Sequence, residues 1–423
     1  MSRSKPAEAE KSIVILGCFD TKGEDFAFLR SCVLEHGEQV IAINTGIRGT
    51  TAAFPVTIES EEVALAGGQS ISALREKDDR GWAVEVMGKG AASVLAGLLA
   101  EGKVKGIVGM GGGGGTFISL CAMQEAPLGI PKLCLSTIAA KDLSRQMGSK
   151  DIVLMPSIVD VAGLNSISRQ LIRQAAAAIC AMARLPSTDV PGGQRRIAIS
   201  MFGNTTACVD HCREMLEARG YEVFIFHATG VGGRTMESLI REGCFDGVLD
   251  ITTTELADEL CGGICSAGPS RLTAAAEMGI PQVVAPGCLD MVNFAQPDTV
   301  PAHYRNRELY SWAPDVTLMR TNEAENRQLG KELAIKLNKA AAEVLLPLKG
   351  ISQIAAPGGV FYRPAVDQAL FEAVKAHAGP GLPVREVDAH INDQAFSRHL
   401  VDALLGLMER RERIDEGNPE SLN

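Results

Sequence analysis

Aromatic residues and long apolar runs are scarce in this chain of 423 residues. Only 4% of the residues are aromatic, whereas Gly and Ala are plentiful, a composition that suits tightly packed α/β layers with glycine-rich turns. No run of eighteen apolar residues occurs, and the charged segment 1–11 lacks the apolar stretch of a signal peptide. We therefore expect a cytoplasmic protein without a membrane partner.

An excess of positive charge is also missing. The formal net charge of −10 argues against nucleic acid as the main partner, because a phosphate backbone is bound through clustered Lys and Arg. The 11 cysteines are odd in number and scattered through apolar segments, so a complete disulfide framework is excluded. Free, buried thiols in a reducing compartment are expected instead.

The chain does contain a run of five glycines. Gly111–Gly115, followed by Thr116, comes after the apolar segment Val104–Met110 and before the apolar, helix-like stretch Phe117–Met123. Glycines bury no side chain and lose much backbone entropy on folding, so a core does not call for five in a row. A strand, a glycine turn and a helix together bring backbone N–H groups against a phosphate. The run therefore predicts a phosphate-binding turn.

The glycine run fits neither of the two standard nucleotide motifs. The spacing Gly109-x-Gly111-x-x-Gly114 matches the dinucleotide fingerprint, but the next strand ends in Ser136-Thr137 without the acid that holds a ribose. The Walker A pattern also fails, because no lysine precedes Thr116. A mononucleotide held by the glycines, with Lys22 supplied from another loop, fits better than NAD.

The two halves of the chain repeat one pattern. The apolar run Ser12–Gly17 is answered by Arg196–Met201, and the predicted strand Gln39–Asn44 is answered by Glu222–His227. Such continuous apolar runs alternating with helices are typical of buried parallel strands in right-handed βαβ units. We therefore predict an α/β protein of two Rossmann-like domains with parallel sheets, related by internal duplication.

Further matches extend the repeat and set the predicted boundaries. Gly129-Ile130-Pro131 in the first half corresponds to Gly279-Ile280-Pro281 in the second. The run 151–155 corresponds to 315–319, and a long predicted helix follows both of these runs. The Pro/Gly/Ser-rich stretch near residue 190 has the character of a linker. The predicted organisation is a disordered N-terminus (1–11), a nucleotide-binding domain (12–185), a linker (186–195), a second domain with a C-terminal extension (196–408) and a frayed tail (409–423).

Polar loops follow the predicted strands of the first half. Ligands of parallel sheets bind beyond the carboxyl ends of the strands, where these loops lie. The loop after the first strand carries a hydroxyl and an ammonium group suited to phosphate oxygens, and an Asp that could hold a ribose, a metal ion or a proton. The predicted nucleotide contacts are Asp20, Thr21, Lys22, Thr45, Gly46, Gly111, Gly112, Gly113, Gly114, Gly115, Thr116, Ser136 and Thr137.

The second half lacks the glycine run and carries other candidate groups. Arg271 follows a Gly-Pro-Ser turn and could hold a carboxylate or a phosphate. Asp290 and His303 could form an acid–base set, and Lys22 of the first half could stabilise phosphate charge. Each of these residue types is more often a turn former or a surface ion pair, so they are weak catalytic candidates.

One helix-like segment of the second half carries three potential metal ligands. Cys208-x-x-His211-Cys212 places three soft ligands on one helical face. A zinc site needs a fourth ligand or a water, and no second paired motif supplies one. We therefore predict no metal ligands in the chain itself.

Several longer motifs carry a family resemblance. ILGCFDTKGEDFAFL, GIVGMGGGGGTFIS, GIPKLCLSTIA and LMPSIVDVAGLN in the first half, with TTTELADELCGGICSAGPSRL, PGCLDMVNF and LMRTNEAEN in the second, resemble a family of plant, bacterial and fungal proteins. That family includes the N-terminal ATP-binding domain of the tomato mosaic virus resistance protein. The resemblance covers nearly the whole chain, about Ser12 to Met408.

The resemblance implies ATP as the ligand of the first domain, and a homodimer. Mg²⁺ would be expected with ATP, near Asp20. The first hypothesis is an ATP-binding protein, whose catalytic form would be an ATP-dependent enzyme that acts on a small anionic ligand in the interdomain cleft. Two alternatives stay open: a non-catalytic interaction module that ATP stabilises, and a hydrolase or lyase that uses Asp, His and Cys residues of the second domain.

Overall fold

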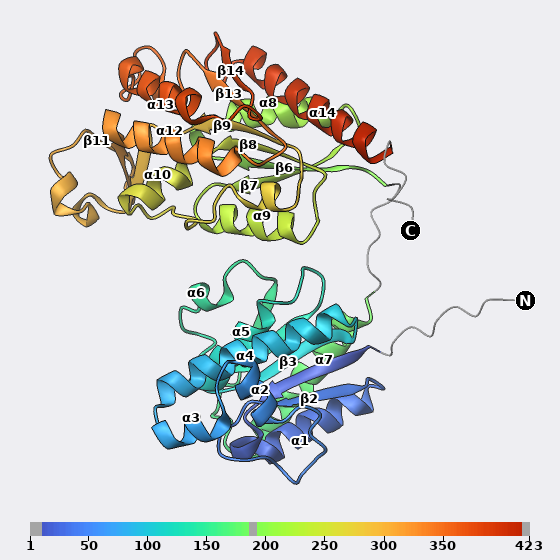
Figure 1. Cartoon of the computed structure of the whole chain (residues 1–423). Coiled ribbons are helices and arrows are strands. Elements are labelled where there is room, and N and C mark those ends of the chain that lie inside the picture. Colours follow the sequence, from blue (N-terminus) through green and yellow to red (C-terminus); the bar gives the residue numbers. More distant parts are fainter. Residues whose placement is uncertain (1–10, 186–192, 417–423) are drawn as a thin grey trace, which may run out of the picture. The chain divides into compact units, whose positions relative to one another are not determined.

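A computed structural model describes residues 11–185 and 193–416, with side chains described through residue 414. The predicted disordered N-terminus and most of the predicted linker, residues 186–192, lie outside the described residues. The chain divides into two compact units, residues 1–189 and 190–423 (Figure 1). We call them unit 1 and unit 2.

Unit 1 is built on five parallel strands in the order β2-β1-β3-β4-β5. The sheet explains the continuous apolar runs of the sequence, because both of its faces are covered by helices. Its strands are β1 (Ser12–Gly17), β2 (Val40–Asn44), β3 (Val104–Gly111), β4 (Lys132–Ser136) and β5 (Ile152–Pro156). Its helices are α1 (Phe19–Glu35), α2 (Ser60–Ala66), α3 (Ile71–Lys77), α4 (Arg80–Ala100), α5 (Gly113–Met123), α6 (Ser144–Met147) and α7 (Ser166–Ala183).

Alternate side chains of β1 enter two separate cores. Ile13 and Ile15 pack with residues of α1 and α7, whereas Val14 and Leu16 pack with residues of α2, α4 and α5. This alternation follows from the two-residue period of a strand. The turns after β1 and β3 therefore lead to helices on opposite faces of the sheet.

Helix α4 is long and apolar enough to cross a membrane, judged by length and composition alone. In unit 1 it packs against α2 and α5 (Figure 1). A Cβ at Gly90 would lie 1.8 Å from the carbonyl oxygen of Val63, so this close helix contact needs a glycine. The apolar surface of α4 is thus used in the core of unit 1.

Unit 2 contains a six-stranded parallel sheet in the order β14-β13-β9-β8-β6-β7. A small antiparallel sheet, β10-β12-β11, is added to it. The strands are β6 (Arg196–Met201), β7 (Glu222–His227), β8 (Gly247–Thr252), β9 (Gln282–Gly287), β10 (Met291–Phe294), β11 (Leu309–Ala313), β12 (Val316–Arg320), β13 (Ala342–Pro347) and β14 (Val384–Val387).

Helices cover both faces of this second sheet. Residues of α8 and α14 pack on one face, and residues of α9, α12 and α13 belong to the separate cores of the other. The helices are α8 (Thr206–Glu217), α9 (Val231–Arg241), α10 (Thr254–Cys261), α11 (Ala274–Glu277), α12 (Glu323–Leu337), α13 (Pro364–His377) and α14 (Gln394–Glu416), with short 3₁₀ turns η1 (Gly203–Thr205), η2 (Pro297–Thr299), η3 (Ala302–Tyr304) and η4 (Gln353–Ala355).

The two units share one strand order. β2-β1-β3-β4-β5 corresponds to β7-β6-β8-β9-β13, as expected of a duplicated chain. The predicted two-domain α/β fold with parallel sheets is confirmed. One predicted match was wrong: of residues 315–319, 316–319 belong to β12 of the antiparallel sheet, and β13 takes the position of β5. Unit 2 inserts β10 to β12 before that strand, so local sequence similarity misled the alignment.

Two predicted boundaries also differ from the structure. Helix α5 begins at Gly113 and not at the predicted Phe117, so three glycines belong to its first turn. Helix α14 continues to Glu416, and residues 409–416 are therefore helical, not a frayed tail. Tertiary packing of its apolar face, including Leu404 and Met408, carries the helix into its charged end.

Candidate functional site

The carboxyl ends of β1 and β3 form a topological switch point in unit 1. These strands are neighbours in the sheet, and the turns that follow them lead to α1 and α5 on opposite faces. The two turns therefore part and leave a crevice, which is where open parallel sheets bind their ligands. The glycine run and the Asp20-Thr21-Lys22 segment occupy these two turns.

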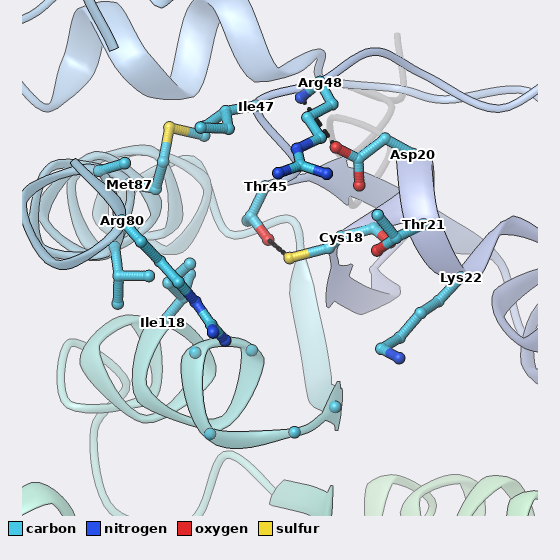
Figure 2. A pocket seen from close by; sticks show the side chains of 18 of the residues that line it. Cys18, Asp20, Thr21, Lys22, Thr45, Ile47, Arg48, Arg80, Met87 and Ile118 are labelled. Atoms are coloured by element: carbon cyan, nitrogen blue, oxygen red, sulfur yellow. Dashed lines mark hydrogen bonds between the residues drawn. The ribbon is translucent and has the colours of Figure 1, made fainter. Parts of the chain in front are cut away.

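A cavity of about 510 Å³ lies at this switch point, within the size range of small-molecule sites. Loops that are far apart in the sequence converge on it (Figure 2). The structure thus brings most of the predicted nucleotide contacts together. Those in the lining are Asp20, Thr21, Lys22, Thr45, Gly46 and the run Gly111–Gly115.

The first turn of α5 leaves the backbone N–H groups of its glycines without a partner in the helix. The first backbone hydrogen bond of α5 runs from the N–H of Thr116 to the oxygen of Gly112 (2.8 Å), so the N–H groups of the preceding glycines have no partner within the helix. None of the five glycines has a positive φ. A Cβ at Gly113 would meet nothing within 4 Å. Neither the backbone conformation nor protein packing requires glycine at this position.

Three cationic side chains line the cavity. Lys22 lies near the start of α1, Arg48 in the loop after β2, and Arg80 in the first turn of α4. No ion pair joins any of the three to an acid within the described parts of the chain. The guanidinium of Arg80 points at the glycine turn (Figure 2). The Lys22 ammonium donates to the oxygen of Val161. The turn and these cations suit an anionic group, and four aspartates also line the cavity: Asp20, Asp78, Asp79 and Asp160.

The opposite wall of the cavity is apolar. Ile47, Met87 and Ile118 lie together on one side, well apart from Lys22 (Figure 2). Ala83 and Val84 of α4 add to the same wall. The cavity therefore combines a face for a flat apolar group with a face for negative charge.

Asn44 fixes the loops that follow β1 and β2. Its side-chain oxygen accepts hydrogen bonds from the N–H groups of Phe19 (3.2 Å) and Gly46 (3.0 Å), and its amide donates to the oxygen of Gly49 (2.9 Å) and to Glu59 (3.0 Å). The side chain is fully buried. Both loops are thereby preorganised at the mouth of the cavity.

Cys18 is half-buried in the cavity wall. Its sulfur lies 3.6 Å from the hydroxyl of Thr45 (Figure 2). Burial raises the pKa of this thiol, and the Asp20 carboxylate adds to the rise, while the hydrogen bond to Thr45 opposes it. Cys18 is therefore a neutral thiol at pH 7, which is a weak nucleophile.

Three predicted contacts do not line the cavity. The hydroxyls of Thr116 and Ser136 face each other at 2.7 Å, and both side chains are fully buried. Thr137 donates its N–H to the oxygen of Gly111 (3.1 Å), and its side chain lies beside Gly112. These residues join the end of β4 to the glycine turn and support the site from behind.

Arg271 does not hold an external anion, and the expectation that it would is wrong. Its guanidinium donates to the buried carboxylates of Asp250, Glu255 and Glu237 and to the oxygen of Thr252. Every N–H of the side chain is used, and none of it is exposed. The sequence shows neither the pairing nor the burial, because the three acids come from other elements.

Asp290 and His303 do not form an acid–base set. Asp290 is fully buried, where it accepts a hydrogen bond from the hydroxyl of Ser352 (2.7 Å), and burial raises its pKa. His303 is exposed on η3, with its ring against Tyr304. No described contact joins the two, so unit 2 offers no catalytic pair from these candidates.

The Cys208, His211 and Cys212 group belongs to the core. Both thiols are fully buried, and they contact Ser397 of α14, whose hydroxyl donates to the sulfur of Cys208. Within the described residues, no group of three or more His, Cys, Asp or Glu side chains is placed to hold a metal ion. These cysteines pack α8 against α14.

Sequence reasoning missed several residues of the cavity wall. Arg80, Ala83, Val84 and Met87 come from α4, which belongs to the long connection between β2 and β3 and not to a turn after a strand. The one local signal was the charged triplet Asp78-Asp79-Arg80 directly before an apolar helix. Nothing in that signal shows that the helix begins at the cavity.

Fold and site together define a two-unit α/β protein with parallel sheets and a cavity at the switch point of the first sheet. Residues 11–188 match the N-terminal domain of the Uncharacterised protein family (UPF0261), and residues 194–408 match its C-terminal domain. The chain therefore belongs to the UPF0261 family.

Relatives confirm the family resemblance seen in the motifs. A UPF0261 protein of Clostridium tetani is 45% identical over 403 residues, covering 95% of this chain and 100% of the relative. The ToMV resistance protein Tm-1 of Solanum lycopersicum is 35% identical over 428 residues, covering 95% of this chain but 56% of the tomato protein. A Streptomyces glycosyltransferase in complex with thymidine diphosphate is 13% identical over 96% of this chain and 99% of that chain, with a TM-score of 0.20, which is too low to carry an argument.

Proposed function

We propose that unit 1 binds ATP in the cavity between the turns after β1 and β3. The observation that carries the proposal is the glycine turn, whose N–H groups are unpaired at the positive end of α5 and face a cavity with three cationic side chains. The triphosphate would lie against this turn. Lys22 and Arg80 would neutralise its charge, and the apolar wall of Ile47, Met87 and Ile118 would hold the base.

Mg²⁺ would reach the site with the nucleotide. This ion needs six oxygen ligands in an octahedron and is commonly bound by one or two carboxylates together with phosphates and waters. Asp160 lines the cavity and could supply such a carboxylate. The remaining ligands would be phosphate oxygens and water.

Isothermal titration calorimetry with ATP tests the proposal, with NAD and inorganic phosphate as comparison ligands. One ATP per chain should bind, and more tightly than NAD or phosphate. Lys22→Gln should weaken ATP binding by about tenfold, because a charge-assisted contact to phosphate is lost. Lys89→Gln removes the same charge from an exposed position of α4 outside the cavity and should leave ATP binding unchanged. Absence of ATP binding by the wild-type chain would refute the proposal.

A further inference from the structure

One buried acceptor in the cavity wall has no partner. The Oδ2 atom of Asp20 accepts the N–H of Arg48 (2.8 Å), which ties the turn after β1 to the loop after β2 (Figure 2). The Oδ1 atom is shielded from solvent and accepts no hydrogen bond in the described structure. A carboxylate oxygen in such a place costs free energy unless a donor meets it. The structure therefore holds a buried acceptor for which the described residues supply no donor.

The Asp20 carboxylate occupies space that a side chain at position 46 would fill. A Cβ at Gly46 would lie 2.2 Å from Oδ1 of Asp20, closer than any tolerated contact. The φ of Gly46 is not positive, so glycine is not needed there for backbone conformation. Asn44 holds the N–H of Gly46 and thereby keeps the loop against Asp20. Gly46 is thus needed to make room for the Asp20 carboxylate.

The position of Asp20 fits the ribose of a bound nucleotide. Asp20 follows β1 and contacts the loop after β2, while the glycine turn follows β3 on the other side of β1. In dinucleotide-binding folds, an acid near the end of the strand beside the phosphate-binding turn accepts a ribose hydroxyl. Such an acid is absent after the glycine run in the sequence, and the fold supplies one from upstream of it.

A metal ion explains Asp20 less well than a hydroxyl donor. One of its oxygens is already committed to a backbone N–H, and it belongs to no described cluster of three or more potential metal ligands. A single buried oxygen acceptor needs only one donor, and one O–H group of a ligand can supply it.

We propose that Asp20 accepts a hydrogen bond from a ribose hydroxyl, so that the site selects nucleotides that carry this hydroxyl over analogues that lack it. This inference rests on the proposed ATP binding and adds the sugar as a determinant of specificity. Loss of a hydrogen bond to a buried charged acceptor should lower affinity by about tenfold or more.

The test compares ATP, deoxy-ATP and dideoxy-ATP by isothermal titration calorimetry on the full chain. The wild type should bind ATP at least tenfold more tightly than dideoxy-ATP, and the two deoxy analogues together identify the hydroxyl. In Asp20→Asn the remaining oxygen must face the N–H of Arg48, so an NH₂ group faces the ligand. This variant should bind ATP and dideoxy-ATP equally.

Gly46→Ala is the second variant, because it displaces the same carboxylate without changing charge. It should also lose the preference for ATP over dideoxy-ATP. Glu24→Gln removes an exposed acid of α1 outside the cavity and should keep the wild-type preference.

Three outcomes separate the two proposals. If the wild type binds no nucleotide, the proposed function fails. If it binds ATP and dideoxy-ATP with equal affinity, ATP binding stands and the ribose contact is wrong. If Asp20→Asn weakens both nucleotides equally and only with Mg²⁺ present, Asp20 is a metal ligand and the inference is overturned.

Discussion

The hydroxyl of Thr116 lies 2.7 Å from the hydroxyl of Ser136, and neither side chain is exposed. This contact joins the first turns of α5 to the end of β4, directly behind the glycine turn. Ser136 also accepts the N–H of Ile138 (3.1 Å). A short buried network thus holds the backbone whose N–H groups face the cavity.

Thr116→Val should lower the free energy of unfolding by about 1 kcal/mol, because it keeps the shape of the side chain but removes this hydrogen bond. Urea denaturation followed by circular dichroism measures the change. The exposed Thr206→Val should change it by less than about 0.5 kcal/mol. Equal losses in both variants would show that the buried hydrogen bond contributes no more to the free energy of unfolding than an exposed one.

Arg271 is the main counter-charge for three buried acids of unit 2. Arg271→Met should cost about 3–5 kcal/mol, because it leaves Asp250, Glu255 and Glu237 without their cation. Arg327→Met removes an exposed pair with Glu323 and should cost less than about 1 kcal/mol. Chemical denaturation of both variants gives the comparison. A stable Arg271→Met protein would mean that these acids take up protons without penalty.

Unit 2 should lose stability as the pH rises through about 6. Burial raises the pKa of Asp367 to about 6, opposed by Arg320 and aided by Asp290. A carboxyl whose pKa is higher in the folded than in the unfolded chain stabilises the fold below the unfolded value of about 4, and this contribution is lost above pH 6.

Urea denaturation at pH 5 and pH 8 measures this loss. Asp367 should contribute about 1 kcal/mol to the difference, and Asp367→Asn should reduce the difference by that amount. Asp258, whose pKa burial raises to about 7, adds in the same direction and would remain in the variant. Higher stability of the wild type at pH 8 than at pH 5 would contradict this reading.

Cys18 offers a direct chemical reporter of the cavity. Its raised pKa predicts slow alkylation at pH 7 and faster reaction as the pH approaches 9 and above. Bound ATP should slow the modification further by covering the thiol. Mass spectrometry after iodoacetamide treatment would follow Cys18, with Cys244 of unit 2 as the reference that ATP leaves unchanged. Equal rates with and without ATP would place the nucleotide elsewhere.

The sequence predicted the strands of unit 1 well because they are buried on both faces and read as continuous apolar runs. The glycine run was an equally clear signal of a turn, since packing does not readily explain five residues without side chains. Most of the predicted contacts do meet in one cavity, because the carboxyl ends of parallel strands share one edge of the sheet.

Other features depend on contacts that no local pattern encodes. Arg80 enters from a helix between β2 and β3, and Arg271 is buried by acids from α9, β8 and α10. The direction in which Thr116 and Ser136 point depends on the packing of α5 against β4. Such features can be seen only in the tertiary structure. They changed the expected role of Arg271, which is used in buried ion pairs, and of Thr116 and Ser136, which support the site from behind.

The most direct test of the central claim is calorimetric titration of ATP into Gly113→Asp. A side chain at Gly113 meets open space, and a carboxylate in the first turn of α5 suits the helix dipole, so the fold should be kept. The same carboxylate would repel the triphosphate. Gly97→Asp places an equal charge on α4 in open space outside the cavity and serves as the matched control. The account predicts that Gly97→Asp binds ATP like the wild type and that Gly113→Asp, folded, does not; undiminished binding by Gly113→Asp would contradict it.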